Sequence, residues 1–281
     1  MPELPEIQAH AERLTADFAG RVLTRFVPLT FTALKTALPA PADAYGEPLR
    51  HVGRRGKYLL LQFDPVTFVV HLMQGGRLLE DAKQAAKPRG GQARFVFDDG
   101  PALLLTEQGT ERRAGVWCLP TTVATASAAP PLDTLGPEAD LVTRDELAEL
   151  LSARSQRLHG FLRDQHAIAG IGRRLANEVC HRAKVSPFSS TKKLTSSQID
   201  RVHLAIRDTI SDGLEYERSR PDMSSSKDRP GGVHGRTGEP CPVCGDTVRA
   251  VEYSGYTVNY CPTCQTDGKL LADNTTSRFL K

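Results

Sequence analysis

The sequence has no long hydrophobic run, and this absence excludes a protein that crosses a membrane through an apolar helix. No apolar stretch among its 281 residues approaches the roughly 18 residues that such a helix needs. The first residues, MPELPEIQ, include Glu3 and Glu6 and have no apolar core, unlike a signal peptide. We therefore expect a cytoplasmic protein with no membrane partner.

The net charge of the chain is also small. The chain has 36 Lys and Arg against 33 Asp and Glu, and the resulting +3 excludes a histone-like protein. The charge is uneven, however, because residues 154–193 contain nine Lys or Arg and two acids, a local balance of +7. A second basic cluster, without acids, consists of Arg50, Arg54, Arg55 and Lys57. Clustered cations beside glycine-rich turns favour a polyanion such as DNA, and a merely solvated basic face is the alternative.

The six cysteines are too few and too unevenly placed for a disulfide framework. Four of them form two C-x2-C pairs that are separated by sixteen residues. These four are Cys241, Cys244, Cys261 and Cys264. The spacing indicates a tetrahedral thiolate zinc site, with two redox pairs as the alternative. Four thiolates leave no open coordination position, so we expect one structural Zn²⁺. Cys118 and Cys180 are expected to be small buried hydrophobic residues.

Hydrophobic periodicity makes the first part of the chain β-rich. Apolar residues at three- and four-residue spacing predict a helix over residues 3–18, ended by Gly20. From about Val22 to Leu119, short apolar runs bounded by Gly, Pro or Asp predict strands. The clearest runs cover residues 58–63, 68–72, 93–97 and 102–105, with a turn at 98–100. This pattern predicts one N-terminal helix and a β-sandwich or barrel.

The second part of the chain has helical periodicity. The stretch 120–131, rich in Ala, Thr and Pro, indicates an interdomain linker. Thr143 and Glu146 form a capping box that predicts a helix through Leu151. Further helices are predicted over 172–183 and 196–214, and Thr195 is a suitable N-cap for the second of these. A mobile loop is predicted over 219–232, and a β-hairpin at 247–258 between the cysteine pairs, turning at Ser254-Gly255.

The amino terminus carries a possible nucleophile. Met1 precedes Pro2, so its removal leaves a secondary amine whose reference pKa, about 8, keeps a useful fraction neutral. Attack of this amine on a sugar C1′ or an aldehyde forms an iminium ion, an electron sink comparable to a lysine Schiff base. Glu3 lies beside it for proton transfer, and Glu6 follows one helical turn later. An ordinary amino terminus is the alternative.

Several motifs in one order resemble the formamidopyrimidine-DNA glycosylase/endonuclease VIII (Fpg/Nei) family of DNA repair glycosylases, over nearly the whole chain. They are Pro2-Glu-Leu-Pro-Glu6, Gly53-Arg-Arg-Gly-Lys-Tyr58, Leu135-Gly-Pro-Glu138, Gly170-Ile-Gly172 followed by Ala176-Asn-Glu178, and Gly235-Arg-Thr-Gly-Glu-Pro-Cys241 leading to Tyr260-Cys-Pro-Thr-Cys-Gln265.

This resemblance implies a multidomain α+β fold with DNA bound in a cleft between the domains. An N-terminal helix and β-sandwich are followed by a helix-two-turn-helix domain and a C-terminal zinc-finger β-hairpin. The expected boundaries are 1–120 for the sandwich, 121–131 for the linker, 132–232 for the helical domain and 233–281 for the hairpin.

The resemblance also implies a bifunctional DNA glycosylase and abasic-site lyase of base excision repair. Pro2 would be the nucleophile, Glu3 the acid/base group, and Lys57 a phosphate contact near a damaged nucleotide flipped out of the duplex. Without the motif, Lys57 would be an ordinary turn lysine. After base loss, the iminium permits β- and then δ-elimination. The residues expected to contact DNA are Glu6, His71, Gln74, Arg112, Arg113, Gly172, Arg173, Arg174 and Tyr256.

Two departures from the family pattern concern phosphate binding. Arg173-Arg174 stand where the family commonly has an Asn after the glycine turn, although arginine also binds phosphate. Tyr256 stands where a hairpin arginine normally reaches phosphate, and it cannot supply that charge. Loss of this contact would weaken insertion of the lesion.

A third departure concerns the residue that fills the gap left by the flipped nucleotide. Met73 or Gln74 can take this place; the register favours Gln74, and a core position is the alternative for Met73. Arg112 and Arg113 lie where relatives place further base-facing residues, but the local sequence assigns them no definite role. His71 is expected to contact phosphate or to support the strand rather than to act as a general base.

The 219–232 loop is short and has no aromatic residues, whereas relatives specific for oxidised purines have a longer closing loop. We therefore expect oxidised pyrimidines or abasic sites as substrates, in damaged double-stranded DNA and also in single-stranded or bubble DNA. A monomer, associated with the nucleoid when bound to DNA, is the default expectation. The alternatives are a non-catalytic damaged-DNA-binding zinc protein, which does not require Pro2, Glu3 and Lys57, and an abasic-site lyase with little base excision.

Overall fold

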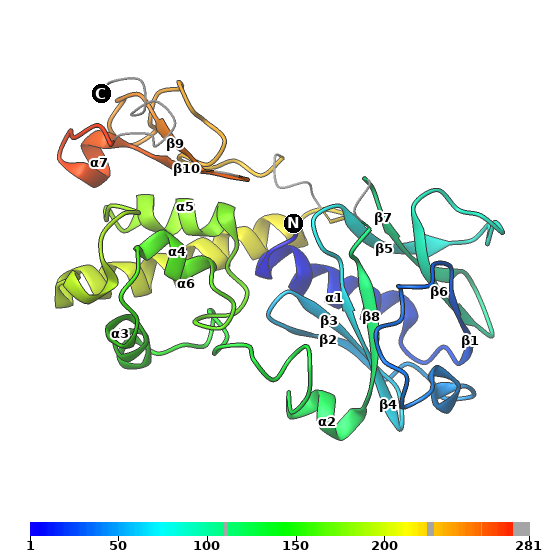
Figure 1. Cartoon of the computed structure of the whole chain (residues 1–281). Coiled ribbons are helices and arrows are strands. Elements are labelled where there is room, and N and C mark those ends of the chain that lie inside the picture. The colour runs from blue at the N-terminus through cyan, green and yellow to red at the C-terminus, as the bar shows by residue number, and fades with distance from the viewer. Residues whose placement is uncertain (110–111, 224–227, 254, 272–281) are drawn as a thin grey trace. The chain divides into compact units, whose positions relative to one another are not determined.

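A computed structural model describes residues 1–109, 112–223, 228–253 and 255–271 of the chain (Figure 1). These residues form two compact units. The first unit contains Met1–Leu135 together with Pro221–Met223, and the second contains Gly136–Arg220 and the described residues from 228 onward. In this described part, no helix is long and apolar enough to cross a membrane.

The first unit consists of a long helix and two four-stranded antiparallel sheets. The helix is α1 (Leu4–Phe18), and a short 3₁₀ helix, η1 (Pro41–Ala44), lies between the first two strands in sequence. One sheet has the order β1 (Leu23–Pro28), β6 (Gly91–Phe97), β7 (Ala102–Glu107), β5 (Gly76–Asp81). The other has the order β2 (His51–Arg55), β3 (Tyr58–Gln62), β4 (Val66–His71), β8 (Gly115–Pro120).

Helix α1 forms where the periodicity predicts it. Its apolar stripe, from Ile7 to Phe18, is buried in one core with side chains from both sheets, including Phe68 and Phe95. Each large side chain buried in this way contributes about 1.5–3 kcal/mol of transfer free energy. The helix ends at Phe18, and Gly20 follows with a positive φ of 87°. The predicted helix and β-sandwich are therefore confirmed.

The four clearest strand predictions correspond to β3, β4, β6 and β7. Gly100, with φ of 73°, lies in the predicted turn between β6 and β7. Strand β1 is harder to recognise because its pairing with β6 shifts register between Leu23 and Arg25. An irregularity of this kind breaks the two-residue alternation on which strand prediction depends.

The stretch predicted as a linker is folded onto the first unit. Residues Thr121–Thr125 form the short helix α2. Ala124 and Leu132 are buried in a cluster with Val69 and Leu119 of the sandwich. The structure therefore places the change of unit after Leu135, beyond the predicted 121–131 linker.

The second unit contains four helices of the helical region and the short 3₁₀ helix η2 (Thr191–Lys193). The helices are α3 (Arg144–Ala153), α4 (Leu158–Arg163), α5 (Arg173–Arg182) and α6 (Ser196–Arg218). Both predicted N-caps are present, because the hydroxyls of Thr143 and Thr195 accept the backbone N–H groups of Glu146 and Gln198. Helix α4, with six residues, is too short for its periodicity to be recognised.

The predicted hairpin between the cysteine pairs is also present. Strands β9 (Arg249–Tyr253) and β10 (Tyr256–Tyr260) are antiparallel, and the short helix α7 (Pro262–Thr266) follows. Of the predicted turn, Ser254 lies outside the described residues, and Gly255 has the positive φ of 86° that favours glycine. Strand β10 packs against α5 within this unit (Figure 1).

The loop predicted over 219–232 buries more than its composition suggests. Met223 is only 7% exposed and lies in the core of the first unit. At the other end, Arg229, Pro230 and Gly232 are hydrogen-bonded to side chains of α5. Residues 224–227 lie outside the described part. The prediction of a loop that cannot bury much is therefore wrong for Met223, whose flexible thioether packs into the core.

Candidate active site and nucleic-acid interface

The candidate nucleophile stands at the rigid start of α1. Glu3 caps this helix, and its side chain accepts the backbone N–H of Glu6. Glu6 Oε2 in turn accepts the backbone N–H of Glu3 at 2.9 Å. Both carboxylates are buried, so the capping box fixes the two acids that follow Pro2.

Removal of Met1 is a precondition for the chemistry. While Met1 is attached, the nitrogen of Pro2 belongs to a tertiary amide whose lone pair is delocalised and not nucleophilic. Met1 is 44% exposed, whereas Pro2 is buried. The bond that must be cut therefore lies at the surface of the first unit, next to a buried amine.

Lys57 is not an ordinary solvated turn residue. It follows Gly56, whose φ is 54°, in the turn between β2 and β3, and it is only 4% exposed. The β2–β3 hairpin is fixed to α1, because Arg54 Nε donates to Gln8 Oε1 at 3.1 Å. Lysine is rarely buried to this degree unless its charge has a partner. The simple alternative of a solvated lysine is therefore excluded.

His71, at the end of β4, is a neutral hydrogen-bond donor. Its ring lies 4.6 Å from that of Tyr58, centroid to centroid, and its Nδ1 accepts the backbone N–H of Met73 at 3.2 Å. Burial, and then the nearby charge of Lys57, lower the pKa of His71 to about 4. The proton of the neutral ring is therefore on Nε2. This state agrees with a phosphate contact or a strand support and disfavours a general base.

The β4–β5 turn separates the two candidates for the gap-filling residue. Met73 has a positive φ of 52°, and its side chain packs against the core of the first unit. Gln74 is exposed. Gln74 is therefore the more exposed of the two, and its role as the gap-filling residue stays a prediction.

A second loop lies beside this turn. The backbone N–H of Gln108 donates to Gly75 O at 3.4 Å, and a Cβ on Gly75 would lie 2.9 Å from Gln108 O. Arg112 and Arg113 follow in this loop, and both are exposed. Only glycine permits such a close approach, so Gly75 joins the turn that carries Gln74 to Gln108, which precedes the two arginines in sequence.

The basic cluster at residues 50–57 is largely used within the first unit. Arg50 forms an ion pair with Asp64 at 3.1 Å, and both side chains are more than half exposed. Arg54 donates to Gln8, as described, and Arg55 Nη2 donates to Leu135 O at 3.1 Å. Each of the three arginines therefore has a hydrogen-bond or ion-pair partner within the first unit.

In the second unit, the glycine turn presents the amino terminus of α5. Gly172 is the N-cap, and Gly170 has a φ of 100°. The amide of Gln165 holds the turn, because its Oε1 accepts from Gly170 N at 3.0 Å and its Nε2 donates to Ile171 O at 2.8 Å. Such a turn directs the first backbone N–H groups of the helix toward an anion.

The two arginines of this turn have different roles. Arg173 is exposed at the first position of α5. Arg174 is only 4% exposed, and its guanidinium donates to the carbonyls of Arg229 and Pro230, the latter at 2.8 Å. The 100° rotation between successive helical residues separates them. Arg173 is therefore exposed to a ligand, and its DNA contact stays a prediction, whereas Arg174 is buried and hydrogen-bonded within the unit.

The face of α5 that carries Arg174 is hydrogen-bonded to residues 229–234, the segment that leads to the zinc finger. Glu178 accepts the backbone N–H groups of Gly232, Val233 and His234 at 2.7, 3.1 and 2.8 Å. Sequence reasoning did not single out Glu178 for this role. The signal was the i, i+4, i+7 spacing of Arg174, Glu178 and His181, a polar stripe on a helix.

The four paired cysteines meet in one cluster. Their sulfur atoms all lie within 4.8 Å of one another, with 3.9 Å between Cys241 and Cys264 and 3.4 Å between Cys244 and Cys261. Tetrahedral zinc, with Zn–S bonds of about 2.3 Å, places its sulfur ligands about 3.8 Å apart. His181 Nε2 lies 3.3 Å from Cys241 Sγ and orients that ligand. The geometry therefore fits one structural Zn²⁺, and it excludes an open catalytic position.

Cys118 and Cys180 are fully buried, as expected. Burial raises the pKa of Cys118 to about 12, and it raises that of Cys180 as well. Both are inert thiols, in agreement with a packing role.

Tyr256 lies in an aromatic cluster on the hairpin. Its ring stacks on that of Tyr253, with 4.9 Å between centroids and 11° between planes. On its own it offers no charge, as expected from the sequence. The guanidinium carbon of Arg163 in α4, however, lies 4.1 Å from the centre of the Tyr256 ring. Sequence reasoning missed this pair because the two residues are 93 positions apart.

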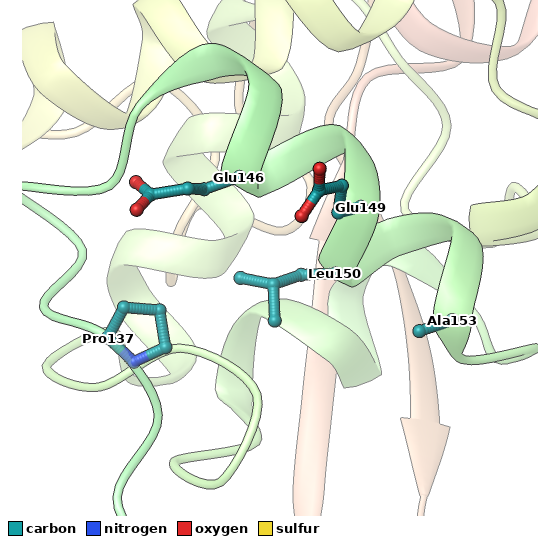
Figure 2. Close-up of a pocket in the computed structure, with 5 residues that line it drawn as sticks. All are labelled: Pro137, Glu146, Glu149, Leu150 and Ala153. Carbon is teal, nitrogen blue, oxygen red and sulfur yellow. The ribbon is translucent and has the colours of Figure 1, made fainter.

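The described part of the second unit has two surface pockets. Of the predicted site residues, Arg174 alone lines either of them, and it lines the second. One, of about 350 Å³, lies along α3, where Leu150 points toward Pro137 beside two glutamates (Figure 2). The other, of about 490 Å³, lies between α5, α6 and residues 229–232, where Arg174 and Glu178 are already hydrogen-bonded to backbone groups.

Comparison with known proteins gives a consistent result. Three family models match in order: the formamidopyrimidine-DNA glycosylase N-terminal domain over residues 1–117, the formamidopyrimidine-DNA glycosylase H2TH domain over 135–225, and the zinc finger found in FPG and IleRS over 238–266.

Relatives agree with these matches. A formamidopyrimidine-DNA glycosylase of Chloroflexus aurantiacus is 33% identical over 286 residues, with 94% of this chain and 98% of the relative covered. An uncharacterized formamidopyrimidine-DNA glycosylase-like protein of Mycobacterium tuberculosis is 44% identical over 149 residues, which cover 52% of this chain and 94% of that protein.

Solved structures share the fold. The MutM (Fpg) protein of Thermus thermophilus has a TM-score of 0.79 at 27% identity, covering 94% of this chain and 98% of that one. The Lactococcus lactis enzyme bound to DNA with an abasic site has a TM-score of 0.81 at 22% identity, covering 94% and 99%. The chain therefore belongs to the formamidopyrimidine-DNA glycosylase (Fpg/Nei) family of base excision repair, and its zinc finger holds one structural zinc ion.

Proposed function

We propose that the protein is a bifunctional DNA glycosylase and abasic-site lyase that acts through the amine of Pro2. The observation that carries this proposal is the rigid start of α1, where Glu3 is buried beside Pro2 and fixed in a capping box. A precise position for both groups matters, because a misplacement of about 1 Å costs on the order of 100-fold in rate.

The chemistry begins after Met1 is removed. The Pro2 nitrogen attacks C1′ of a nucleotide flipped out of the duplex, and the bond from C1′ to the damaged base breaks. Glu3 transfers a proton to O4′ or to the departing base, the sugar ring opens, and the resulting iminium joins Pro2 to C1′. Loss of a C2′ proton then expels the 3′ phosphate, and a second elimination expels the 5′ phosphate. Water hydrolyses the final iminium and releases the enzyme.

The buried Lys57 and the neutral His71 suit a supporting role at the DNA backbone. The ammonium of Lys57 provides positive charge, and His71 Nε2–H provides a neutral donor beside it. Gln74 would fill the gap left by the flipped nucleotide, with Arg112 and Arg113 on the neighbouring loop. All of these residues belong to the first unit.

For the substrate we propose oxidised pyrimidines or abasic sites. The segment over residues 219–232, which lies where relatives specific for oxidised purines have a longer closing loop, is short and has no aromatic side chain to pack on a flipped purine. Oxidised purines are the competing class, because the full-length relatives are named formamidopyrimidine-DNA glycosylases.

Borohydride trapping tests the catalytic proposal. Reduction of the iminium should link the mature protein covalently to DNA that contains an abasic site, and Pro2→Gly, with a primary amine, should trap less. Intact mass spectrometry should show that Met1 is absent from the trapping-competent protein. If mature protein forms no adduct with abasic or lesion-containing DNA, a non-catalytic damaged-DNA-binding protein is the correct description.

A lesion panel then identifies the substrate. Duplexes with an oxidised pyrimidine, formamidopyrimidine, 8-oxoguanine or an abasic site should be compared, together with single-stranded and bubble forms. Faster cleavage of the oxidised pyrimidine than of either purine lesion supports the proposal, and the reverse order contradicts it. Cleavage of the abasic DNA alone identifies a lyase with little base excision.

A further inference from the structure

A cluster of cations and aromatic rings joins α4 to the zinc hairpin. The guanidinium carbon of Arg163 lies 4.1 Å from the centre of the Tyr256 ring, which is within the range of a cation–π interaction. The other partners of Tyr256 are Tyr253, stacked at 4.9 Å, and His159, nearly parallel with centroids 6.2 Å apart. The hairpin tyrosine therefore holds an arginine that comes from a different element.

Arg163 has a positive charge that no acidic side chain in the described part of the chain pairs with. Among the residues that the structure describes, no carboxylate forms an ion pair with Arg163 or Arg173. The neighbouring acid in sequence, Asp164, pairs with Arg154 at 2.7 Å instead. Arg163 is partly exposed and Arg173 is exposed, so both guanidinium groups are available to a ligand.

A buried histidine, His159, lies close enough to both arginines to be affected by their charges. His159 is only 3% exposed, and its Nε2 makes no hydrogen bond to any described residue. Burial, followed by the charges of Arg163 and, more weakly, His234 and Arg173, holds the pKa of His159 near 3. Because the ring is neutral, it adds no third positive charge beside Arg163 and Arg173.

We propose that Arg163 and Arg173 together bind a phosphodiester group of DNA, and that Tyr256 is a positioning residue that holds Arg163 in place. This inference rests on the proposed function, since DNA is the ligand. It also gives Tyr256 on the hairpin a role in phosphate binding. The positive charge that Tyr256 cannot supply comes from α4, over the face of the same ring.

The chemistry of the cluster selects a nucleotide strand over a simple anion. Guanidinium groups donate two parallel hydrogen bonds to phosphate oxygens. The N-terminal N–H groups of α5 add a partial positive charge beside Arg173. The half-exposed rings of Tyr253 and Tyr256 offer aromatic faces to the sugar or base next to that phosphate.

Salt-dependent binding to a duplex with a tetrahydrofuran abasic analogue tests the phosphate contact without requiring catalysis. The slope of log K against log[salt] falls by about 0.9 for each phosphate contact removed. We expect Arg163→Gln to reduce the slope by about 0.9 and to weaken binding about 10-fold at moderate salt. The control is Arg207→Gln, an exposed arginine on α6, which should leave slope and affinity unchanged.

Tyr256 variants test the positioning role. Tyr256→Phe keeps the aromatic face and should bind as the wild type does, whereas Tyr256→Ala should show part of the loss seen in Arg163→Gln. In the double variant Arg163→Gln/Tyr256→Ala, the second change should add little, because its effect passes through Arg163. Zinc content must remain one per chain in each variant. Full additivity of the two losses would show that Tyr256 acts independently and would overturn its positioning role.

The outcomes separate this inference from the proposed function. If the wild type binds the duplex and Arg163→Gln binds with the same slope, the phosphate site is wrong, whatever borohydride trapping shows. If Arg163 controls the slope but no adduct forms, the phosphate site stands and the catalytic proposal fails. If the wild type does not bind damaged DNA at all, both fail.

Discussion

Glu178→Gln should weaken the attachment of the zinc finger to α5. The wild-type carboxylate accepts three backbone N–H groups, with Gly232 on Oε2 and with Val233 and His234 on Oε1. Glutamine keeps one acceptor oxygen, which can still receive two of them. Its NH₂ group then faces the third N–H, so that one charge-assisted bond is replaced by two opposed donors.

The magnitude follows from these contacts. A hydrogen bond to a charged group contributes about 1.5–3 kcal/mol, and an unsatisfied buried donor carries a comparable cost. We expect Glu178→Gln to lower the free energy of unfolding of the second unit by about 1.5–3 kcal/mol. Glu178→Ala removes all three acceptor contacts and should cost about 3–5 kcal/mol. The loosened segment leads directly to Cys241, so zinc should also be released faster.

Urea unfolding and the rate of zinc transfer to a chromogenic chelator measure the two effects. Glu215→Gln is the matched control, since Glu215 is an exposed glutamate of α6. Glu178→Gln should unfold at lower urea than this control and lose zinc sooner. The reasoning is refuted if the two variants agree within about 0.5 kcal/mol and release zinc at the same rate, because surface substitutions differ by no more than this.

Three further predictions concern the core, the zinc ion and pH. Met223→Ala should lower the free energy of unfolding of the first unit by about 2–4 kcal/mol in urea, because truncation of a buried methionine leaves a cavity. A change below about 0.5 kcal/mol would contradict the burial of Met223 in this core. Cys261→Ser should reduce bound zinc, measured by elemental analysis, from one ion per chain to nearly none, since Cys261 is a ligand; retention of a full equivalent would be incompatible with the four-thiolate site. His10, buried against Leu78 O, has a pKa lowered to about 4, chiefly by burial. Between pH 6.5 and 4 the unfolded chain binds a proton at His10 that the folded chain does not, so the free energy of unfolding should fall as the pH drops through this window. His10→Gln should make that fall shallower, and an unchanged pH profile would show that His10 is not its cause.

Local features were predictable because their causes lie within a few residues. The capping boxes at Thr143 and Thr195 depend on a side chain three positions away, and the apolar stripe of α1 depends on one helical period. The zinc site was predictable for a related reason, because each C-x2-C turn places two sulfur atoms at one point regardless of the rest of the fold.

Features that depend on long-range contact were not predictable from spacing. The arginines at 173 and 174 look equivalent in sequence, but the carbonyls of Arg229 and Pro230 are what draw Arg174 inward. Met223 lies among serines and charged residues, and its burial depends on the core of the first unit. Lys57 has the sequence context of a solvated turn, yet the turn leaves it 4% exposed.

The Tyr256 cluster shows why a departure from a family pattern has to be judged in space. Read by position, the hairpin has lost a phosphate-binding charge, which favours weaker insertion of a lesion and a protein nearer to a simple lyase. In the structure, an arginine with no acidic partner among the described residues lies over the same ring. A phosphate responds to the position of the charge and not to the element that carries it. If Arg163→Gln leaves DNA binding unchanged, the loss of the hairpin arginine at position 256 counts against base excision. If Arg163→Gln weakens DNA binding, the charge has been replaced and the tyrosine does not count against base excision.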